Sequence, residues 1–253
     1  MKILRFLFKN KIWWGIVEGD YVQKITPSPF EKFKRIGKKL SLEDVKILPP
    51  SNPSKIILVG LNFKDHAQEL NLPLPSHPII FLKPPSSIVG HKDFIICPPK
   101  IGRVDYEAEL AFVIKRRAKN ISSEEAHKFI LGYTCLNDIT ARTIQKTEVQ
   151  WTRAKSFDTF CPLGPWIETE IDNPMNLCIR LYVNGKLRQN SSTSKLIFSP
   201  FKLLEFISKV MTLYPGDVIS CGTPPGVGPL KDRDKVCVEI EKIGTLCNTV
   251  KKV

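Results

Sequence analysis

The chain has 253 residues, of which 42% are hydrophobic and 25% are charged, and its formal net charge is +13. This length suffices for one large domain or two small ones with a buried core, so neither disulfides nor a metal is needed merely for stability. No apolar run approaches the roughly 20 residues of a membrane helix, and Arg5 and Lys9 interrupt the apolar segment that a signal peptide would need. We therefore expect a cytoplasmic globular protein without a membrane partner.

The first fifty residues predict a small β-rich N-terminal domain. Short strands are expected at 2–8 and 12–17, with a third beginning at 21, and a short helix is possible in the lysine-rich segment 31–48. Segment 48–54, Leu-Pro-Pro-Ser-Asn-Pro-Ser, has the composition of a linker. We place the domain boundary there, with domains at 1–50 and 51–253.

Short β segments dominate the remainder of the chain. Strands are expected at 56–59, 79–82, 107–115, 179–183, 186–188, 218–221, 236–240 and 246–250. Asn184-Gly185 predicts a tight hairpin turn. Helical structure is expected at 65–70, after Ser122, and after Ser199-Pro200, where an N-cap precedes a first-turn proline. These patterns indicate an α+β or mostly β fold.

The most informative segment is Asp105-Tyr106-Glu107-Ala108-Glu109-Leu110, beside an apolar run. Residues i and i+2 of a strand point to the same face, so Glu107 and Glu109 should project together. Two carboxylates in that position repel unless a positive charge lies between them, and oxygen-only ligands suit Mg²⁺, Mn²⁺ or Ca²⁺ rather than zinc. The alternative is a solvated strand face.

Asp138 provides a possible third oxygen ligand, because Asn137-Asp138 follows a β-like stretch. Three carboxylates leave coordination positions for water and for a chelating substrate, which is how Mg²⁺ usually binds. Alternatively, Asn137-Asp138 is a turn or a helix cap.

His66 and Glu69 follow a buried strand and are spaced so that one helical turn brings them together. A carboxylate that holds an imidazole raises its basicity, as in a general base. The alternative is an ordinary surface pair.

Two further segments carry candidate substrate contacts. Lys155 lies among aromatic and small residues and could stabilise an enolate or carboxylate oxygen; alternatively it is a surface lysine with a buried stem. Thr223, in the rigid loop Gly222–Pro229, could bind a carboxylate, or the loop is only a tight turn. This loop lacks the Lys-Ser/Thr of a phosphate-binding loop.

The cysteines and the excess charge have simpler interpretations. The seven cysteines are widely spaced and form no C-x-x-C pair, so we expect buried, reduced thiols rather than a zinc site or a disulfide framework. The lysines and arginines are spread over the chain without an interleaved aromatic pattern. A solvated basic surface is therefore favoured over a nucleic-acid site.

Together these motifs, in this order over residues 51–250, resemble the fumarylacetoacetate hydrolase family, and residues 1–50 resemble a small N-terminal domain found on many bacterial members. The resemblance implies a mixed β-sandwich roll with peripheral helices, usually in a homodimer. Four residues differ from those commoner in the family, and none is a proposed ligand or base: Phe63, Thr143, Ser156 and Cys221.

The resemblance also implies roles for individual residues. The metal ligands would be Glu107, Glu109 and Asp138, and the bound ion Mg²⁺ or Mn²⁺. His66 and Glu69 match the family's water-activating pair, and Lys155 matches its catalytic lysine. Three positions match the lining of the substrate pocket, namely Arg142, Gln145 and Thr223.

The implied substrate is a small anionic 2-oxo acid with a second carbonyl, such as an acylpyruvate. His66 would activate water, and cleavage of a carbon–carbon bond would release a pyruvate enolate. The same enolate chemistry also serves isomerases, tautomerases and decarboxylases of 2-oxo dicarboxylic acids, among them oxaloacetate and hydroxyhepta-diene-dioate. The alternative outside enzymes is a basic nucleic-acid-binding module.

Overall fold

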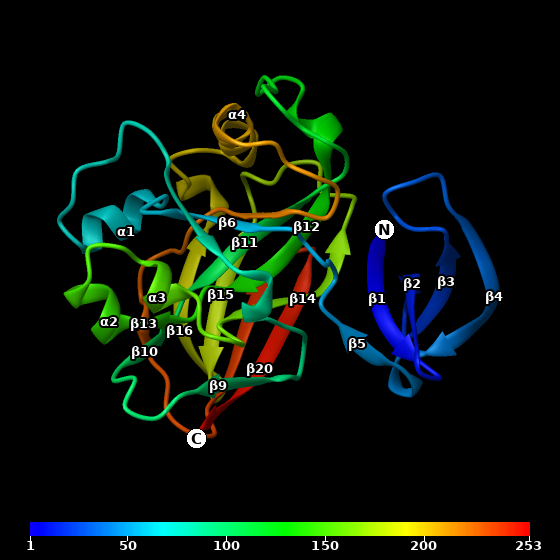
Figure 1. The fold of residues 1–253 in the computed structure, drawn as a ribbon, viewed down its shortest axis with the longest axis horizontal. Helices are drawn as coiled ribbons and strands as arrows, with labels where there is room; N and C mark the ends of the chain where they lie inside the picture. The colour runs from blue at the N-terminus through cyan, green and yellow to red at the C-terminus, as the bar shows by residue number, and fades with distance from the viewer.

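A computed structural model describes all of residues 1–253 and confirms an α+β, mostly β fold. Figure 1 shows two parts: a small N-terminal module and a larger body whose helices lie at its periphery. The module is an antiparallel meander of β1 (Lys2–Phe8), β2 (Lys11–Glu18), β3 (Tyr21–Thr26) and β4 (Lys34–Ser41), and β5 (Lys46–Leu48) pairs with β1. Its small core consists of Leu4, Phe6, Val22 and Val45.

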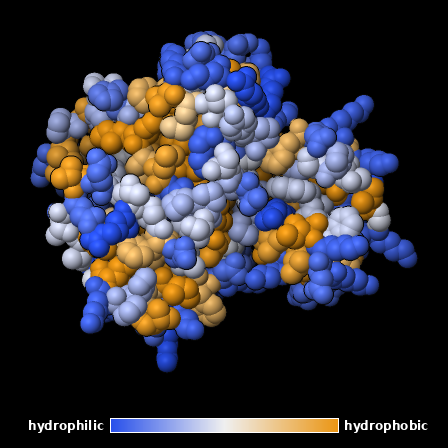
Figure 2. All heavy atoms as spheres, in the orientation of Figure 1, coloured by the Kyte–Doolittle hydropathy of each residue, from blue (hydrophilic) through white to orange (hydrophobic).

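The helix expected in 31–48 is wrong. That segment forms β4 and a 3₁₀ turn at Leu42–Asp44, because pairing with β3 satisfies the backbone and overrides the weak helix preference of lysine. β4 is an edge strand, and its basic residues oppose pairing with another chain. Glu18 holds Arg35 and Lys39. Figure 2 shows hydrophilic side chains along this outer edge of the module.

The module and the body share one twelve-stranded sheet. Its order is β4-β3-β2-β1-β14-β12-β11-β17-β6-β7, where β1 joins β14 through Lys2–Glu168 and Ile3–Ile167. The body strands of this sheet are β6 (Ile56–Gly60), β7 (Ile79–Lys83), β11 (Ala108–Ile114), β12 (Ile130–Asn137), β14 (Cys161–Glu168) and β17 (Val218–Ser220), and the short β8 (Ile88–Val89) pairs with β14. The domain division at residue 50 stays a prediction.

A second, five-stranded sheet packs against β11, β12 and β14 and completes the sandwich. It consists of β16 (Lys186–Ser192), β15 (Cys178–Val183), β19 (Lys235–Ile240), β20 (Gly244–Lys252) and β9 (Phe94–Cys97). A core of 39 buried residues includes side chains from both sheets. The predicted hairpin is confirmed, with Asn184 and Gly185 in the left-handed region between β15 and β16. A third sheet contains β13 (Thr140–Ala141), β10 (Val104–Tyr106) and β18 (Gly228–Pro229).

Four short α-helices lie outside the sheets: α1 (Lys64–Glu69), α2 (Arg142–Thr147), α3 (Thr152–Lys155) and α4 (Pro200–Val210). The Ser199 cap is confirmed, since its hydroxyl accepts a hydrogen bond from the Lys202 amide, and α4 buries Leu203 and Ile207. The helix expected after Ser122 is only a 3₁₀ turn at Ala126–Phe129, because the chain enters β12 at the next residue. The other 3₁₀ turns are Pro85–Ser87 and Thr193–Lys195. None of the helices has the length and apolar character required to cross a membrane.

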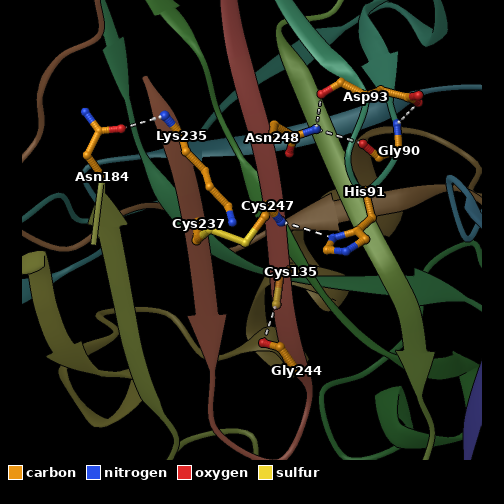
Figure 3. Close-up of a disulfide and its surroundings, with 10 residues drawn as sticks. All are labelled: Gly90, His91, Asp93, Cys135, Asn184, Lys235, Cys237, Gly244, Cys247 and Asn248. Carbon is orange, nitrogen blue, oxygen red and sulfur yellow. Dashed lines mark hydrogen bonds between the residues drawn. A yellow bond between two sulfur atoms is a disulfide. The ribbon is translucent and has the colours of Figure 1, made fainter. Parts of the chain in front are cut away.

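A disulfide joins Cys237 of β19 to Cys247 of β20, directly across the strand pair (Figure 3). The expectation of seven reduced thiols is therefore wrong for this pair, and the other five cysteines are free. The sequence spacing alone could not show this pairing, because it depends on the register of the β19–β20 hairpin.

His91 lies beside this disulfide, and its Nδ1 accepts a hydrogen bond from the Cys247 amide at 3.1 Å (Figure 3). Its pKa is lowered from 6.5 to about 4, chiefly by burial and also by the positive charges of Lys92 and Lys235. The negative charge of Asp93 opposes this shift only in part. Between these values the unfolded chain binds a proton that the folded chain excludes, so this group makes stability fall as pH drops from 6.5 towards 4.

His91→Gln is expected to remove this acid sensitivity. Because the imidazole is partly exposed, we expect the wild type to lose only about 1.5 kcal/mol more than the variant over that pH range. Urea unfolding of both proteins at several pH values measures this difference. His127→Gln, at an exposed histidine, is the matched control. Equal slopes for His91→Gln and the wild type would contradict the assignment.

Candidate active site

Glu107, Glu109 and Asp138 converge in the body. The strand expected over 107–115 is confirmed as β11 (Ala108–Ile114), with Glu107 at the break between β10 and β11, Glu109 within β11 and Asp138 directly after β12. The break is fixed by hydrogen bonds, since the Glu107 amide donates to Asn137 Oδ1 at 3.0 Å and the Asp138 amide donates to the Glu107 carbonyl at 2.8 Å. All three side chains are buried, with one oxygen from each within 4.8 Å of the others.

Three cationic side chains surround these carboxylates. Lys155 Nζ of α3 lies 2.9 Å from Glu107 Oε2 and also contacts Asp138 Oδ2. Arg142 contacts Glu107 Oε1, and Lys83 contacts Asp138 Oδ1. The cluster is thus nearly neutral before any divalent cation enters, which makes its burial tolerable.

The ionisation of the two glutamates differs. Burial, with the neighbouring charge of Asp138, raises the pKa of Glu109 to about 8, although Ser220 donates a hydrogen bond to it. Burial would also raise the pKa of Glu107, but the charges of Lys155 and Arg142 outweigh it and the pKa is lowered. Burial lowers the pKa of Lys155, yet Asp138 and Glu107 produce a net rise. Strongly shifted groups in one pocket are typical of a functional site.

These groups line a cavity of about 320 Å³. Eight of the nine predicted site residues line it: His66, Glu107, Glu109, Asp138, Arg142, Gln145, Lys155 and Thr223. The ninth, Glu69, contacts His66 instead. Apolar side chains including Leu70, Phe81 and Trp151 complete the wall, a mixture typical of small-molecule pockets.

His66 and Glu69 form the predicted pair on α1, with 2.8 Å between His66 Nδ1 and Glu69 Oε2. This helix is fastened at both ends. Asp65 Oδ2 accepts a hydrogen bond from Ser191 Oγ of β16 at 2.6 Å, and Glu69 Oε1 accepts one from the Gly226 amide at 3.0 Å. The imidazole therefore faces the cavity from an element anchored to two other segments.

The three residues expected to contact substrate have distinct surroundings. Arg142 binds Asp105 through Nε at 2.9 Å and also contacts Glu107 and Gln145, so much of its hydrogen-bonding capacity holds the acidic cluster in place. Thr223 Oγ1 accepts a hydrogen bond from Gln189 Nε2 at 2.9 Å.

Two buried residues in this network were not expected from the sequence, Lys83 and Gln189. Gln189 links Thr223 to β11, since its Oε1 accepts a hydrogen bond from the Ala108 amide at 2.9 Å. The available signal for Lys83 was a lysine ending the apolar strand Ile79–Lys83 just before two prolines. Neither contact could be located without the tertiary pairing of distant strands.

The donor set fits a hard divalent cation. Buried carboxylate oxygens within 4.8 Å of one another are suitable ligands for Mg²⁺ or Mn²⁺, whereas zinc prefers nitrogen and sulfur donors. Three protein ligands would leave coordination positions for water or a substrate. The buried Glu-Glu-Asp cluster could therefore hold a divalent ion.

Family models match nearly the whole chain. The model described as "Fumarylacetoacetate (FAA) hydrolase C-terminal" matches residues 55–251, and the one described as "Rv2993c-like, N-terminal" matches residues 1–50. The fold and the buried acidic cluster agree with this match, since together they are typical of an enzyme that holds its substrate in a pocket beside three carboxylates. The chain belongs to the fumarylacetoacetate hydrolase family, whose members are enzymes.

Three similar proteins illustrate the range of the family. Protein Rv2993c of Mycobacterium tuberculosis is 44% identical, with 99% of this chain and 98% of that protein covered. The mitochondrial oxaloacetate tautomerase fahd2 of Xenopus laevis is 48% identical over 83% of this chain and 70% of its own length. The crystal structure of a 5-carboxymethyl-2-hydroxymuconate delta-isomerase from Mycobacterium smegmatis superposes with a TM-score of 0.95 at 42% identity, covering 100% of each chain.

Proposed function

We propose that this protein is a Mg²⁺- or Mn²⁺-dependent hydrolase that cleaves a carbon–carbon bond in 2,4-dioxo acids such as acylpyruvates. The single observation that carries this proposal is the cavity in which the acidic cluster, Lys155 and the His66–Glu69 pair meet. The first two serve any enolate chemistry. The third supplies a general base for water, which hydrolysis requires.

A divalent ion held by Glu107, Glu109 and Asp138 would supply Lewis-acid polarisation of the substrate's carboxylate and 2-oxo oxygen. His66, oriented by Glu69, accepts a proton from water, and the resulting hydroxide adds to the 4-carbonyl carbon. Collapse breaks the C3–C4 bond and leaves a carboxylic acid and the enolate of pyruvate, which a proton converts to pyruvate. Lys155 Nζ provides positive charge for the developing enolate oxygen, and Thr223 is available to the substrate carboxylate.

Isomerisation or tautomerisation of 2-oxo dicarboxylic acids is the second candidate. It is favoured by the similarity to the oxaloacetate tautomerase and to the delta-isomerase. These reactions move a proton through the same enolate but consume no water. Under this candidate, Lys155 and the acidic cluster keep their roles and His66 is no longer needed to activate water.

We propose residues 1–50 and 51–253 as two domains, and a homodimer as the working assembly. Both follow the family resemblance, and sedimentation of the purified chain tests the second. The charge of +13 suits an anionic substrate, because a positive field raises its local concentration.

A spectrophotometric panel tests the function. It follows the enol absorbance of an acylpyruvate, oxaloacetate and a hydroxyhepta-diene-dioate, with EDTA and after addition of Mg²⁺ or Mn²⁺. We expect metal-dependent loss of acylpyruvate absorbance with release of one pyruvate per substrate. Oxaloacetate or diene-dioate turnover without any acylpyruvate cleavage would favour the second candidate, and no turnover with tight, salt-sensitive binding of DNA would favour a binding module.

A further inference from the structure

Lys83 is a completely buried lysine whose only polar partners belong to the segment of the third proposed ligand. Its Nζ donates to Asp138 Oδ1 and, at 2.9 Å, to the carbonyl oxygen of Ile139. No part of its side chain is exposed. Burying an ammonium group costs several kcal/mol unless its partners compensate, so this lysine needs a reason beyond general packing.

The position of Lys83 is fixed independently of the cluster. It is the last residue of β7, which pairs with β6 through Ile56, and Pro84 follows it. A residue before proline is restricted to extended backbone, so the direction of its side chain is set locally. The Ile139 carbonyl anchors Nζ at a second point.

The two oxygens of Asp138 are divided between two lysines. Oδ1 accepts a hydrogen bond from Lys83, whereas Oδ2 accepts one from Lys155. Lys155 has an alternative partner in Glu107 Oε2 at 2.9 Å. It could therefore release Oδ2 and remain paired, whereas Lys83 has no second carboxylate within reach.

We propose that Lys83 is a positioning residue for the divalent ion: by retaining Oδ1 of Asp138, it presents Oδ2 as a single-oxygen ligand. This inference rests on the proposed function, because it assumes a cation among Glu107, Glu109 and Asp138. A bidentate Asp138 would occupy an extra coordination position. Lys83 thus keeps that position open for the substrate's carboxylate or 2-oxo oxygen.

The two possible roles of Lys83, as a residue that orients Asp138 or only as a nearby positive charge, predict opposite changes in cation binding. If Lys83 acted only as a nearby positive charge, its removal would make the cavity more negative and would tighten binding of a divalent ion. If Lys83 orients Asp138, its removal leaves the carboxylate free to rotate and weakens binding. Loss of a residue that orients a metal ligand typically costs about 10–100-fold in metal affinity.

Titration of the metal-free full chain with Mn²⁺ alone, with free Mn²⁺ counted by electron paramagnetic resonance, separates these cases without any substrate. Lys83→Met is expected to raise the Kd about 10–100-fold. Lys55→Met is the matched control, because it removes a lysine from the buried carboxylate of Asp217, outside the cavity. We expect it to leave the Kd within about twofold of the wild-type value.

An unchanged or lower Kd for Lys83→Met overturns the positioning role. If Lys83→Met does not give a cooperative thermal transition, Lys83→Gln replaces it, because its neutral amide is one bond too short to take the place of Lys83 Nζ beside Asp138 Oδ1. A raised Kd in that variant supports the inference and an unchanged Kd overturns it. A wild-type protein that binds no Mn²⁺ would instead overturn the metal site of the proposed function, so the two failures are distinguishable.

Discussion

Glu109→Gln is expected to abolish cation binding and turnover together. The substitution preserves size but replaces a carboxylate oxygen that can bind a cation with an amide nitrogen that cannot, at a buried position of the acidic cluster. Mutation of a residue that only hydrogen-bonds a metal ligand typically lowers metal affinity by about 10–100-fold. The loss of a ligand itself should therefore lower the affinity by at least about 100-fold. Mn²⁺ titration and the acylpyruvate assay measure the two effects on one preparation.

The matched control is Glu168→Gln. Glu168 is also a buried glutamate, but it lies at the end of β14, outside the cavity, where it contacts the amino group of Met1. This variant should bind Mn²⁺ and turn over substrate as the wild type does. Full activity of Glu109→Gln in the presence of EDTA would disprove the assignment of the acidic cluster.

His66→Ala is expected to separate hydrolysis from simple enolisation. Removal of a general base typically slows the step that it serves by about 10²–10⁴-fold, so acylpyruvate cleavage should fall by that amount. Interconversion of the keto and enol forms of oxaloacetate needs no activated water, and we expect it to fall by less than about tenfold. Stopped-flow absorbance with each substrate measures both rates.

His77→Ala provides the control for this experiment. His77 lies between α1 and β7, and it is exposed and outside the cavity. It should leave both rates unchanged. Unimpaired acylpyruvate cleavage by His66→Ala would disprove its role as the base, whereas an equal loss in both reactions would assign it to proton transfer at the enolate.

The main features of the candidate site could be predicted because its chemistry is written in short segments. The i, i+2 spacing of Glu107 and Glu109 and the i, i+3 spacing of His66 and Glu69 fix local geometry before any tertiary contact forms. The convergence of these segments with Asp138 was an expectation from family resemblance. The structure brings His66 and the three acidic residues into one cavity, with Glu69 held against His66.

What could not be predicted depends on which strands pair and in which register. The contact of Lys83 with Asp138 requires β7 and the end of β12 to meet, and the Cys237–Cys247 bond requires two strands to pair without a one-residue slip. The lysine-rich segment 31–48 was misassigned for a similar reason. Its local composition permits a helix, and only the neighbouring strand β3 decides otherwise.

The junction of β1 with β14 has a consequence for the evolution and engineering of the chain. The N-terminal module does not hang from a flexible tether; it covers backbone groups that β14 would otherwise present to solvent. A shortened chain that begins after the linker would expose an unpaired strand edge on β14, and we expect it to be prone to self-association. We therefore expect the module to prevent intermolecular strand pairing at this edge of the body.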